Sequence, residues 1–474
     1  MSSIDRILAN PALKKISFYL LFAVLEIGIF WFIASFITTH FPLLLLLALI
    51  GFLALLILVK LFKQPVNLLF LGLMTIYNPI YAYLVLTSWW RHGSVRVIIS
   101  SAFLALFLII YGAWSLREKK VRSATPLDKY LIFSGAVILL IGAASYLRGN
   151  STKFILADIF PLIEFGAYFF FATVFIKTKK QLYHIIFGLI AWLLLIELAG
   201  VIIYIIDPSV FGYQADPGGI VVKRLADFMA AFTLPFIIVM YIFLPNKKTS
   251  PQNLLTGRKI LFLLLAIIPI LALLFSFFRS LWLGVIAALV VTFFTLIKRQ
   301  VAWKMALLSA FTLISLFFIV DQMIIVPQRV FNGTSLYQLV HARVFAESVE
   351  SNSIRGRFDD QKLMLKGFIE KPLIGYGFGA APGTSNYFTA LLFMVGLPAA
   401  IIICLPFYII WLKAYTVYFS LTDSLDKGLM LAFIAMFTSI AVLLLSFPAV
   451  IHFPLFAYLG FFAASVYIIP KHTT

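Results

Sequence analysis

Acidic residues and cysteine are scarce in this sequence. Asp and Glu together number 18 among 474 residues, against 37 Lys and Arg, and Cys404 is the single cysteine. One cysteine excludes an intrachain disulfide. The sequence also lacks a P-loop, a dinucleotide-binding fingerprint, a cluster of metal ligands and a recognisable Ser/His/Asp arrangement. We therefore expect neither a metal nor an organic cofactor.

Polar stretches are rare as well, since 63% of the residues are hydrophobic and the mean hydropathy is +1.07. A chain of this composition needs lipid as the solvent for most of its surface. Apolar runs of about 20 residues, each long enough to cross a bilayer as a helix, recur along the chain. We predict an all-α polytopic membrane protein with about 14 transmembrane helices (about 12 to 14), in contact with membrane lipids and no nucleic acid.

The distribution of basic residues predicts the orientation. With the N-terminus inside, Lys and Arg occur in every alternate loop, as the positive-inside rule requires. This orientation places both termini in the cytoplasm, about eleven helices within residues 1–325 and about three within residues 387–474. The interval 326–386, which holds seven basic residues, then forms an extracytoplasmic loop.

Within that loop, residues 355–371 predict an amphipathic helix at the membrane interface or over the helix bundle. Oppositely charged side chains recur along it at the spacing of neighbouring helical turns. The predicted apolar face consists of Phe358, Leu365, Phe368 and Ile369, and the predicted charged face of Asp359, Lys362, Lys366 and Glu370.

A glycine-rich segment at residues 375–383 follows Pro372, which ends the predicted helix. Closely spaced glycines permit unusual backbone angles and let a ligand approach main-chain N–H groups. The same composition is also typical of a flexible connector. The spacing of Gly375, Gly377 and Gly379 leaves both interpretations open.

Some charged residues lie in apolar surroundings. Arg279 lies in FSFFRSLWLG, where a cation is costly unless it is paired or solvated. Either a bound anion pairs with it, or its side chain extends to the outer headgroups. Glu26, Glu164 and Glu197 lie within predicted spans, and we expect them to face the interior of the bundle in structural roles.

Residues 355–398 read RGRFDDQKLMLKGFIEKPLIGYGFGAAPGTSNYFTALLFMVGLP. This stretch resembles the signature region of the O-antigen ligase and O-antigen polymerase superfamily. That region contains an Arg, an amphipathic helix, a Pro-Leu-Ile-Gly-x-Gly-x-Gly segment, an Asn that opens the next span and a Gly-Leu pair. FSFFRSLWLG, with Arg279, and KRLADFMAAFTLPF, with Arg224, resemble two further landmarks. The expected extent of the resemblance is roughly residues 220–465.

The resemblance implies a metal-independent glycosyltransferase at the outer face of the bacterial cytoplasmic (inner) membrane. Its donor would be a polyprenyl-diphosphate-linked glycan, and its acceptor a hydroxyl of a glycan or glycolipid. Guanidinium groups bind phosphate oxygens in pairs and keep their charge in apolar surroundings. The predicted diphosphate-binding residues are Arg224, Arg279, Arg355 and Arg357, and the loop motif comprises Pro372, Gly375, Gly377, Gly379, Ser385 and Asn386.

The sequence departs from the ligases of this family at one position. They carry a His immediately before the Asn, held to activate the acceptor hydroxyl, whereas this chain has Ser385 before Asn386. A serine cannot act as a general base near neutral pH. The missing His favours a polysaccharide polymerase, or another member of the superfamily, over a lipid A core ligase. The candidates for the base are Asp359, Asp360, Glu347, His341 and His452.

Two other functions compete with this hypothesis. A flippase for lipid-linked polysaccharide would also be basic, but its cations should lie within spans and it needs no external loop of this length. A peptidoglycan polymerase of the shape, elongation, division and sporulation type would use an extracytoplasmic carboxylate, for which Asp359 or Asp360 would be the analogue. A purely anchoring role leaves the external arginines unexplained.

Overall fold

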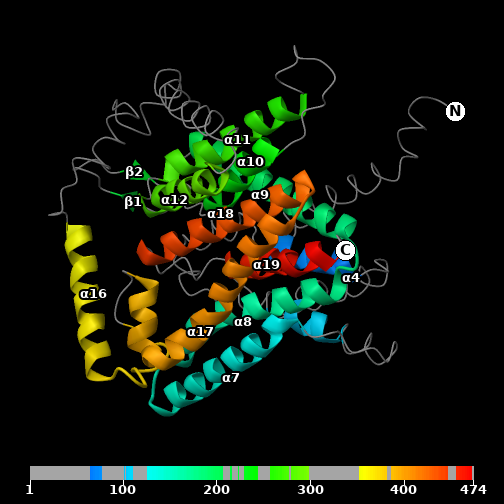
Figure 1. Cartoon of the computed structure of the whole chain (residues 1–474). Coiled ribbons are helices and arrows are strands. Elements are labelled where there is room, and N and C mark those ends of the chain that lie inside the picture. The colour runs from blue at the N-terminus through cyan, green and yellow to red at the C-terminus, as the bar shows by residue number, and fades with distance from the viewer. Residues whose placement is uncertain are drawn as a thin grey trace, which may run out of the picture. The chain divides into compact units, whose positions relative to one another are not determined.

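The structure, a computed structural model, describes residues 65–76, 101, 103–109, 111, 125–206, 214–215, 222–223, 229–243, 257–276, 279–297, 352–381, 386–446 and 455–471. The chain divides into two compact units, Met1–Leu68 and Leu69–Thr474, and the architecture below is that of the second. The elements, labelled in Figure 1, are α4 (Pro65–Ile76), α7 (Pro126–Leu147), α8 (Thr152–Phe175), α9 (Lys179–Ile206), β1 (Gln214–Ala215), β2 (Val222–Lys223), α10 (Ala230–Phe243), α11 (Gly257–Ser276), α12 (Arg279–Ile297), α16 (Asn352–Glu370), α17 (Tyr387–Ser420), α18 (Ser424–Ser446) and α19 (Leu455–Lys471).

Apolar helices dominate the described part of the chain. Five of them, α7, α8, α9, α17 and α18, are long and apolar enough to cross a membrane, and α10, α11, α12 and α19 are shorter apolar helices. Within the described ranges, the strands β1 and β2 form one short antiparallel pair. These helices confirm the prediction of a helical membrane protein. The predicted number of spans includes residues outside the described ranges.

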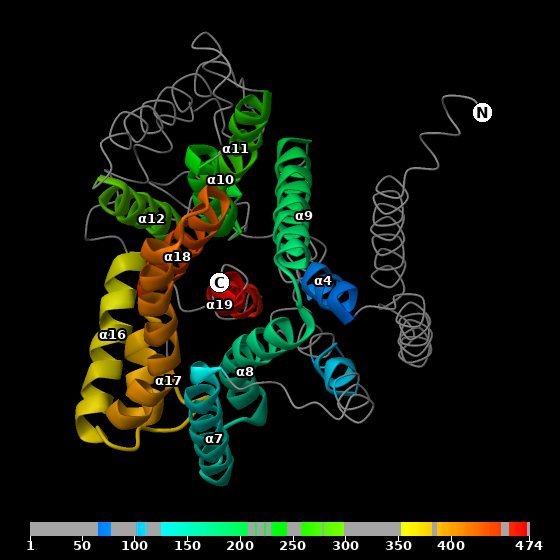
Figure 2. The ribbon, with the colours of Figure 1, turned by 45° about the vertical axis from the view of Figure 1, so that its right-hand side comes forward.

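Helix α19 forms the centre of the bundle. It is apolar on all sides, and nearly every side chain from Leu455 to Ile469 is buried, as expected for a helix enclosed by others. Figure 1 and Figure 2 show it surrounded by other helices, and it packs most extensively on α8. A Cβ atom at Gly460 would overlap the carbonyl oxygen of Phe165. Glycine therefore allows the backbones of α19 and α8 to touch.

Helix α18 organises the other part of the bundle, where it packs against α10, α12 and α17. Small residues again lie at the crossings. A Cβ atom at Gly284 would lie 2.7 Å from the backbone oxygen of Ser439, and one at Gly428 would lie 2.8 Å from Cβ of Phe243. Close packing of this kind holds helices together in lipid, where the hydrophobic effect between them is absent.

Several polar side chains within the bundle form pairs between helices. Glu164 and Glu197 are both fully buried, which confirms the expectation that they face the interior. The Thr233 hydroxyl donates to Glu197 Oε1 at 2.6 Å and so links α10 to α9. Lys179 Nζ donates to Asp426 Oδ2 at 2.8 Å, and the Tyr183 hydroxyl donates to the other carboxylate oxygen. These contacts join α9 to α18.

Candidate functional site

The candidate site forms around a break in α17 at Gly396. Gly396 has φ +75° and ψ 172°, which lies outside the helical region, and Pro398 follows it. In an uninterrupted helix, the carbonyl of Met394 would accept from the N–H of residue 398. Proline has no N–H, so this carbonyl loses its helical donor. The break thus exposes backbone groups in a helix that is otherwise suited to lipid.

The segment from Pro372 to Ala380, which includes Gly377, provides new hydrogen-bond partners for the backbone groups exposed by the break in α17. An unpaired backbone group in hydrocarbon costs several kcal/mol, so the break requires such partners. The segment runs beside α17 and exchanges donors and acceptors with it in both directions. The three hydrogen bonds are Tyr376 N to Phe393 O at 3.0 Å, Gly377 N to Met394 O at 2.7 Å and Leu397 N to Pro372 O at 2.8 Å.

Glycine is needed where the two backbones meet. Gly375, Gly377 and Gly379 have φ values of +57°, +99° and +79°, which L side chains rarely adopt. A Cβ atom at Gly396 would lie 2.6 Å from the carbonyl oxygen of Leu373, and one at Gly375 would overlap the carbonyl of Met394. The glycine-rich segment is therefore packed against α17, and the interpretation as a flexible connector does not describe it.

The N–H groups of this segment donate to the protein. Each of the six from Gly375 to Ala380 has an acceptor on the chain. The alternative in which these N–H groups bind a ligand therefore does not fit the structure. The acceptors, in order, are Lys371 O, Phe393 O, Met394 O, Ser145 Oγ, Asp158 Oδ2 and Gly377 O.

Four residues at the junction of α7 and α8, which we call the polar corner, hold the other side of the segment. Asn150 Nδ2 donates to Tyr376 O at 3.2 Å and to Phe378 O at 3.0 Å. The polar corner therefore forms hydrogen bonds with both N–H and C=O groups of the segment's backbone. Its remaining bonds are Phe378 N to Ser145 Oγ at 2.8 Å, Gly379 N to Asp158 Oδ2 at 2.7 Å and Arg148 Nη1 to Gly375 O at 3.2 Å.

Tyr376 connects the segment to α16. Its ring stacks on Phe393, with centroids 4.7 Å apart and planes at 11°, and Lys371 Nζ lies 4.2 Å from its centroid. Its hydroxyl donates to Glu370 Oε2 at 2.7 Å. This hydrogen bond is the main cause that raises the pKa of Tyr376 above its ordinary value, with smaller contributions from burial and from the charge of Glu370.

Helix α16 lies alongside α17 in both views (Figures 1 and 2). The side that meets the protein carries Met364 and Gly367, which are buried. A Cβ atom at Gly367 would overlap the ring of Phe393, so glycine permits this approach. Phe358, Leu365 and Ile369, from the predicted apolar face, are instead 60%, 42% and 74% exposed. This apolar stripe therefore points away from α17.

The remaining predicted site residues are only partly described. Arg279 is the first residue of α12, and Arg355 and Arg357 lie in the first turns of α16. The side chains of these three residues lie outside what is described, as do Arg224, Glu347, His341, His452 and Ser385. On α16, Asp359 is exposed and Asp360 is half-buried.

Asn386, the asparagine of the motif, caps α17. Its Oδ1 accepts from Phe388 N at 2.9 Å and from Thr389 N at 3.3 Å. An asparagine at this position satisfies N–H groups that have no helical acceptor. Asn386 therefore fixes where the loop ends and α17 begins.

The sequence reasoning missed most of the polar corner. Of its four residues, only Arg148 has a signal in the sequence, because it is a basic residue between two apolar runs. Ser145, Asn150 and Asp158 lie at the ends of apolar helices, where polar residues are ordinary. Asn150 and Phe378 are 228 residues apart in the chain, so no local pattern connects them.

The fold and the packed glycine motif define a multi-pass helical membrane protein with a loop helix fixed against the bundle. Residues 261–393 match the family described as O-antigen ligase. The match confirms the resemblance to the O-antigen ligase and polymerase superfamily. It includes Arg279, Arg355, Arg357 and the motif from Pro372 to Asn386, and it is shorter than the expected interval 220–465. A comparison with curated proteins gives no match.

Proposed function

We propose that this protein transfers a glycan from a polyprenyl-diphosphate-linked donor to a hydroxyl of an acceptor glycan or glycolipid at the outer face of the bacterial cytoplasmic membrane. The acceptor oxygen attacks the anomeric carbon of the donor and forms the new glycosidic bond. The bond from that carbon to the diphosphate oxygen breaks. The polyprenyl diphosphate leaves with the electron pair on that oxygen, and the hydroxyl proton passes to a base.

The observation that carries this proposal is the family match over residues 261–393, which supports O-antigen ligase- or polymerase-like activity. The packing of the glycine-rich motif adds a structural argument to this match. The motif holds the end of α16 against α17 and the polar corner, and α16 carries Arg355 and Arg357. A fixed helix can present its arginines to a phosphate group more reproducibly than a mobile loop.

The proposed diphosphate-binding residues are Arg224, Arg279, Arg355 and Arg357. Guanidinium groups would bind the phosphate oxygens and stabilise the negative charge that develops as the diphosphate leaves. This role needs no metal ion. Asp359 and Asp360 remain the candidates for the base on α16, beside Glu347, His341 and His452.

The proposal places both termini in the cytoplasm, with about 14 spans and residues 326–386 outside. The exposed apolar stripe of α16 supports an interfacial position. Phe358, Leu365 and Ile369 would insert into the outer leaflet while α16 rests on α17 with its other side. An interfacial helix lies at the depth where the diphosphate of a lipid-linked donor is found.

The test uses purified protein in proteoliposomes with a polyprenyl-diphosphate-linked glycan and an acceptor. Arg279→Ala and Arg357→Ala should each reduce transfer by about 100-fold or more, the usual effect of removing a group that stabilises developing negative charge. Arg258→Ala, at a position predicted to be cytoplasmic, should retain transfer. Membrane insertion of all three variants is measured in parallel.

Two results would contradict the proposal. If both Arg279→Ala and Arg357→Ala retain full transfer, the arginines do not bind the diphosphate. If the wild type moves the lipid-linked glycan across the bilayer without lengthening or transferring it, the protein is a flippase. The products also separate ligation from polymerisation, since a polymerase forms chains of several repeats.

A further inference from the structure

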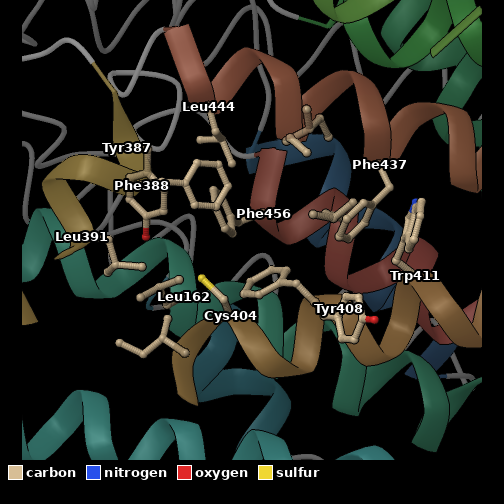
Figure 3. A pocket seen from close by; sticks show the side chains of 15 residues that line it. Leu162, Tyr387, Phe388, Leu391, Cys404, Tyr408, Trp411, Phe437, Leu444 and Phe456 are labelled. Atoms are coloured by element: carbon tan, nitrogen blue, oxygen red, sulfur yellow. The ribbon is translucent and has the colours of Figure 1, made fainter. Parts of the chain in front are cut away.

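An apolar cavity of about 250 Å³ lies between α17, α18 and α19, with Leu162 of α8 in its wall. None of its 15 lining residues is charged, and seven are aromatic. Figure 3 shows Tyr387 and Phe388 at one end of the cavity and Tyr408 and Trp411 at the other, with Cys404 between them. The cavity therefore follows α17 from its first residues inward.

The chemistry of the wall defines the ligand. The polar groups of its wall are the hydroxyls of Tyr387 and Tyr408, the indole N–H of Trp411 and the thiol of Cys404. A cavity with so few polar groups suits hydrocarbon better than water or a sugar. A dry apolar cavity of about 150 Å³ accommodates benzene, so a volume of 250 Å³ has room for about two five-carbon isoprene units. Flat, branched isoprene units fit between aromatic rings.

We propose that this cavity binds the polyprenyl chain of the lipid-linked donor. The inference rests on the proposed function, because it assigns the lipid part of the same substrate. The cavity begins at Tyr387, the residue that follows the cap Asn386, where the motif-bearing loop joins α17. A diphosphate held by the loop would therefore place its prenyl chain at this end of the cavity.

The polar corner lies close to the same end of the cavity. Leu162, which lines the cavity, lies one helical turn after Asp158 on α8, and Asp158 accepts from Gly379 N. The packed motif and the cavity are thus adjacent along α17. We assign the cavity to the donor and not to a bulk membrane lipid, because the cavity begins where the motif-bearing loop joins α17.

The experiment fills the cavity from two walls. Ala441 on α18 and Cys404 on α17 are the smallest side chains that line it. Transfer is measured with a long-chain donor and with a donor whose lipid is a single isoprene unit. In the wild type, kcat/KM should favour the long-chain donor. Ala441→Phe and Cys404→Phe should each lower that preference by about tenfold, the equivalent of about 1.4 kcal/mol.

Ala136→Phe is the matched control, since Ala136 is an exposed residue of the apolar helix α7, outside the cavity. It should leave the preference unchanged. Transfer from the single-unit donor shows that the filled variants fold. If both filled variants keep the wild-type preference, the prenyl chain lies elsewhere and the inference fails. If the wild type transfers from neither donor, the proposed function fails first.

A binding measurement tests the cavity independently of transfer. Cys404 is the single cysteine of the chain, so a small apolar maleimide reports on this cavity without engineering. Long-chain polyprenyl diphosphate should slow its labelling at least about fivefold, because the chain would cover the thiol. Equal protection by added phospholipid, or no protection by the diphosphate, would overturn the assignment.

Discussion

Gly377 N donates to Met394 O at 2.7 Å, and this carbonyl lacks a helical donor because residue 398 is proline. The glycine-rich segment thus completes α17 at the point where its own hydrogen bonding fails. Each part depends on the other: the segment needs the break for its acceptors, and the break needs the segment for its donors. The motif residues that the structure describes therefore have a structural role, because they hold the end of α16 in place.

Replacing Gly377 tests this dependence. Gly377→Ala should destabilise the protein by about 1–3 kcal/mol, because φ is +99° and the new Cβ would lie 2.6 Å from Ser145 Oγ. Gly135→Ala is the control: a Cβ there meets nothing within 4 Å, and alanine is the better helix former by about 0.5–1 kcal/mol. Thermal unfolding in detergent measures both. A Gly377→Ala variant as stable as the control would contradict the packing described for this segment.

Asn150 offers a sharper test of the polar corner. Asn150→Ala removes the donors to Tyr376 O and Phe378 O and should cost about 1–3 kcal/mol. Asn150→Asp should cost more, because its carboxylate oxygens would face two carbonyl oxygens. The readouts are thermal stability and protease cleavage within residues 371–381. The idea is wrong if the aspartate variant is as stable as the wild type or more stable than the alanine variant.

The helices could largely be predicted, because lipid imposes long apolar runs. The run at residues 130–147 predicts the helix observed as α7, which begins earlier, at Pro126. The capping residues explain the difference: Thr125 N donates to Asp128 Oδ2 at 2.6 Å, and the Thr125 hydroxyl donates to Oδ1 at 2.8 Å. A polar cap of this kind lies outside an apolar run and is not detected by hydropathy.

The glycine motif was located by sequence, but its role was not. The spacing of Gly375, Gly377 and Gly379 permits unusual backbone angles, yet it does not reveal the acceptors of the N–H groups in this segment. Those acceptors include Ser145 and Asp158, far away in the chain, and Met394, whose availability depends on Pro398. Periodicity likewise predicts an apolar stripe on α16. It does not show that Met364 and Gly367, on another side of the helix, make the contact with the protein.

The pair of Tyr376 and Glu370 predicts a pH dependence. The pKa of Tyr376 is raised above 10.0, first by the hydrogen bond that its hydroxyl donates to Glu370. A raised folded-state pKa means that the contribution of the pair is fully present below about pH 10 and is lost as pH rises through the higher value. The tyrosinate absorbance of wild type minus Tyr376→Phe isolates this group. Glu370→Gln should shift its titration to lower pH. A Tyr376 that titrates at the ordinary value would contradict the contact.

Lys179 and Asp426 allow a double-mutant cycle between α9 and α18. Their side chains are 21% and 1% exposed. Removal of one partner from a buried pair costs about 3–5 kcal/mol, and because Lys179 is partly exposed, we expect about 2–3 kcal/mol for Lys179→Met. Asp426→Asn in the same chain should recover most of this loss, because no charge is then left buried. Lys180→Met, at an exposed neighbouring position, should change stability by less than about 0.5 kcal/mol.

The measured quantity in this cycle is the coupling free energy, which should reach at least about 1 kcal/mol for residues in direct contact. In the Lys179→Met variant, Tyr183 remains a donor to Asp426. The carboxylate therefore keeps one partner, and the protein should still fold. A coupling near zero would mean that Lys179 is solvated independently of Asp426. The connection between α9 and α18 would then depend on the tyrosine alone, and Tyr183→Phe would be the more damaging change.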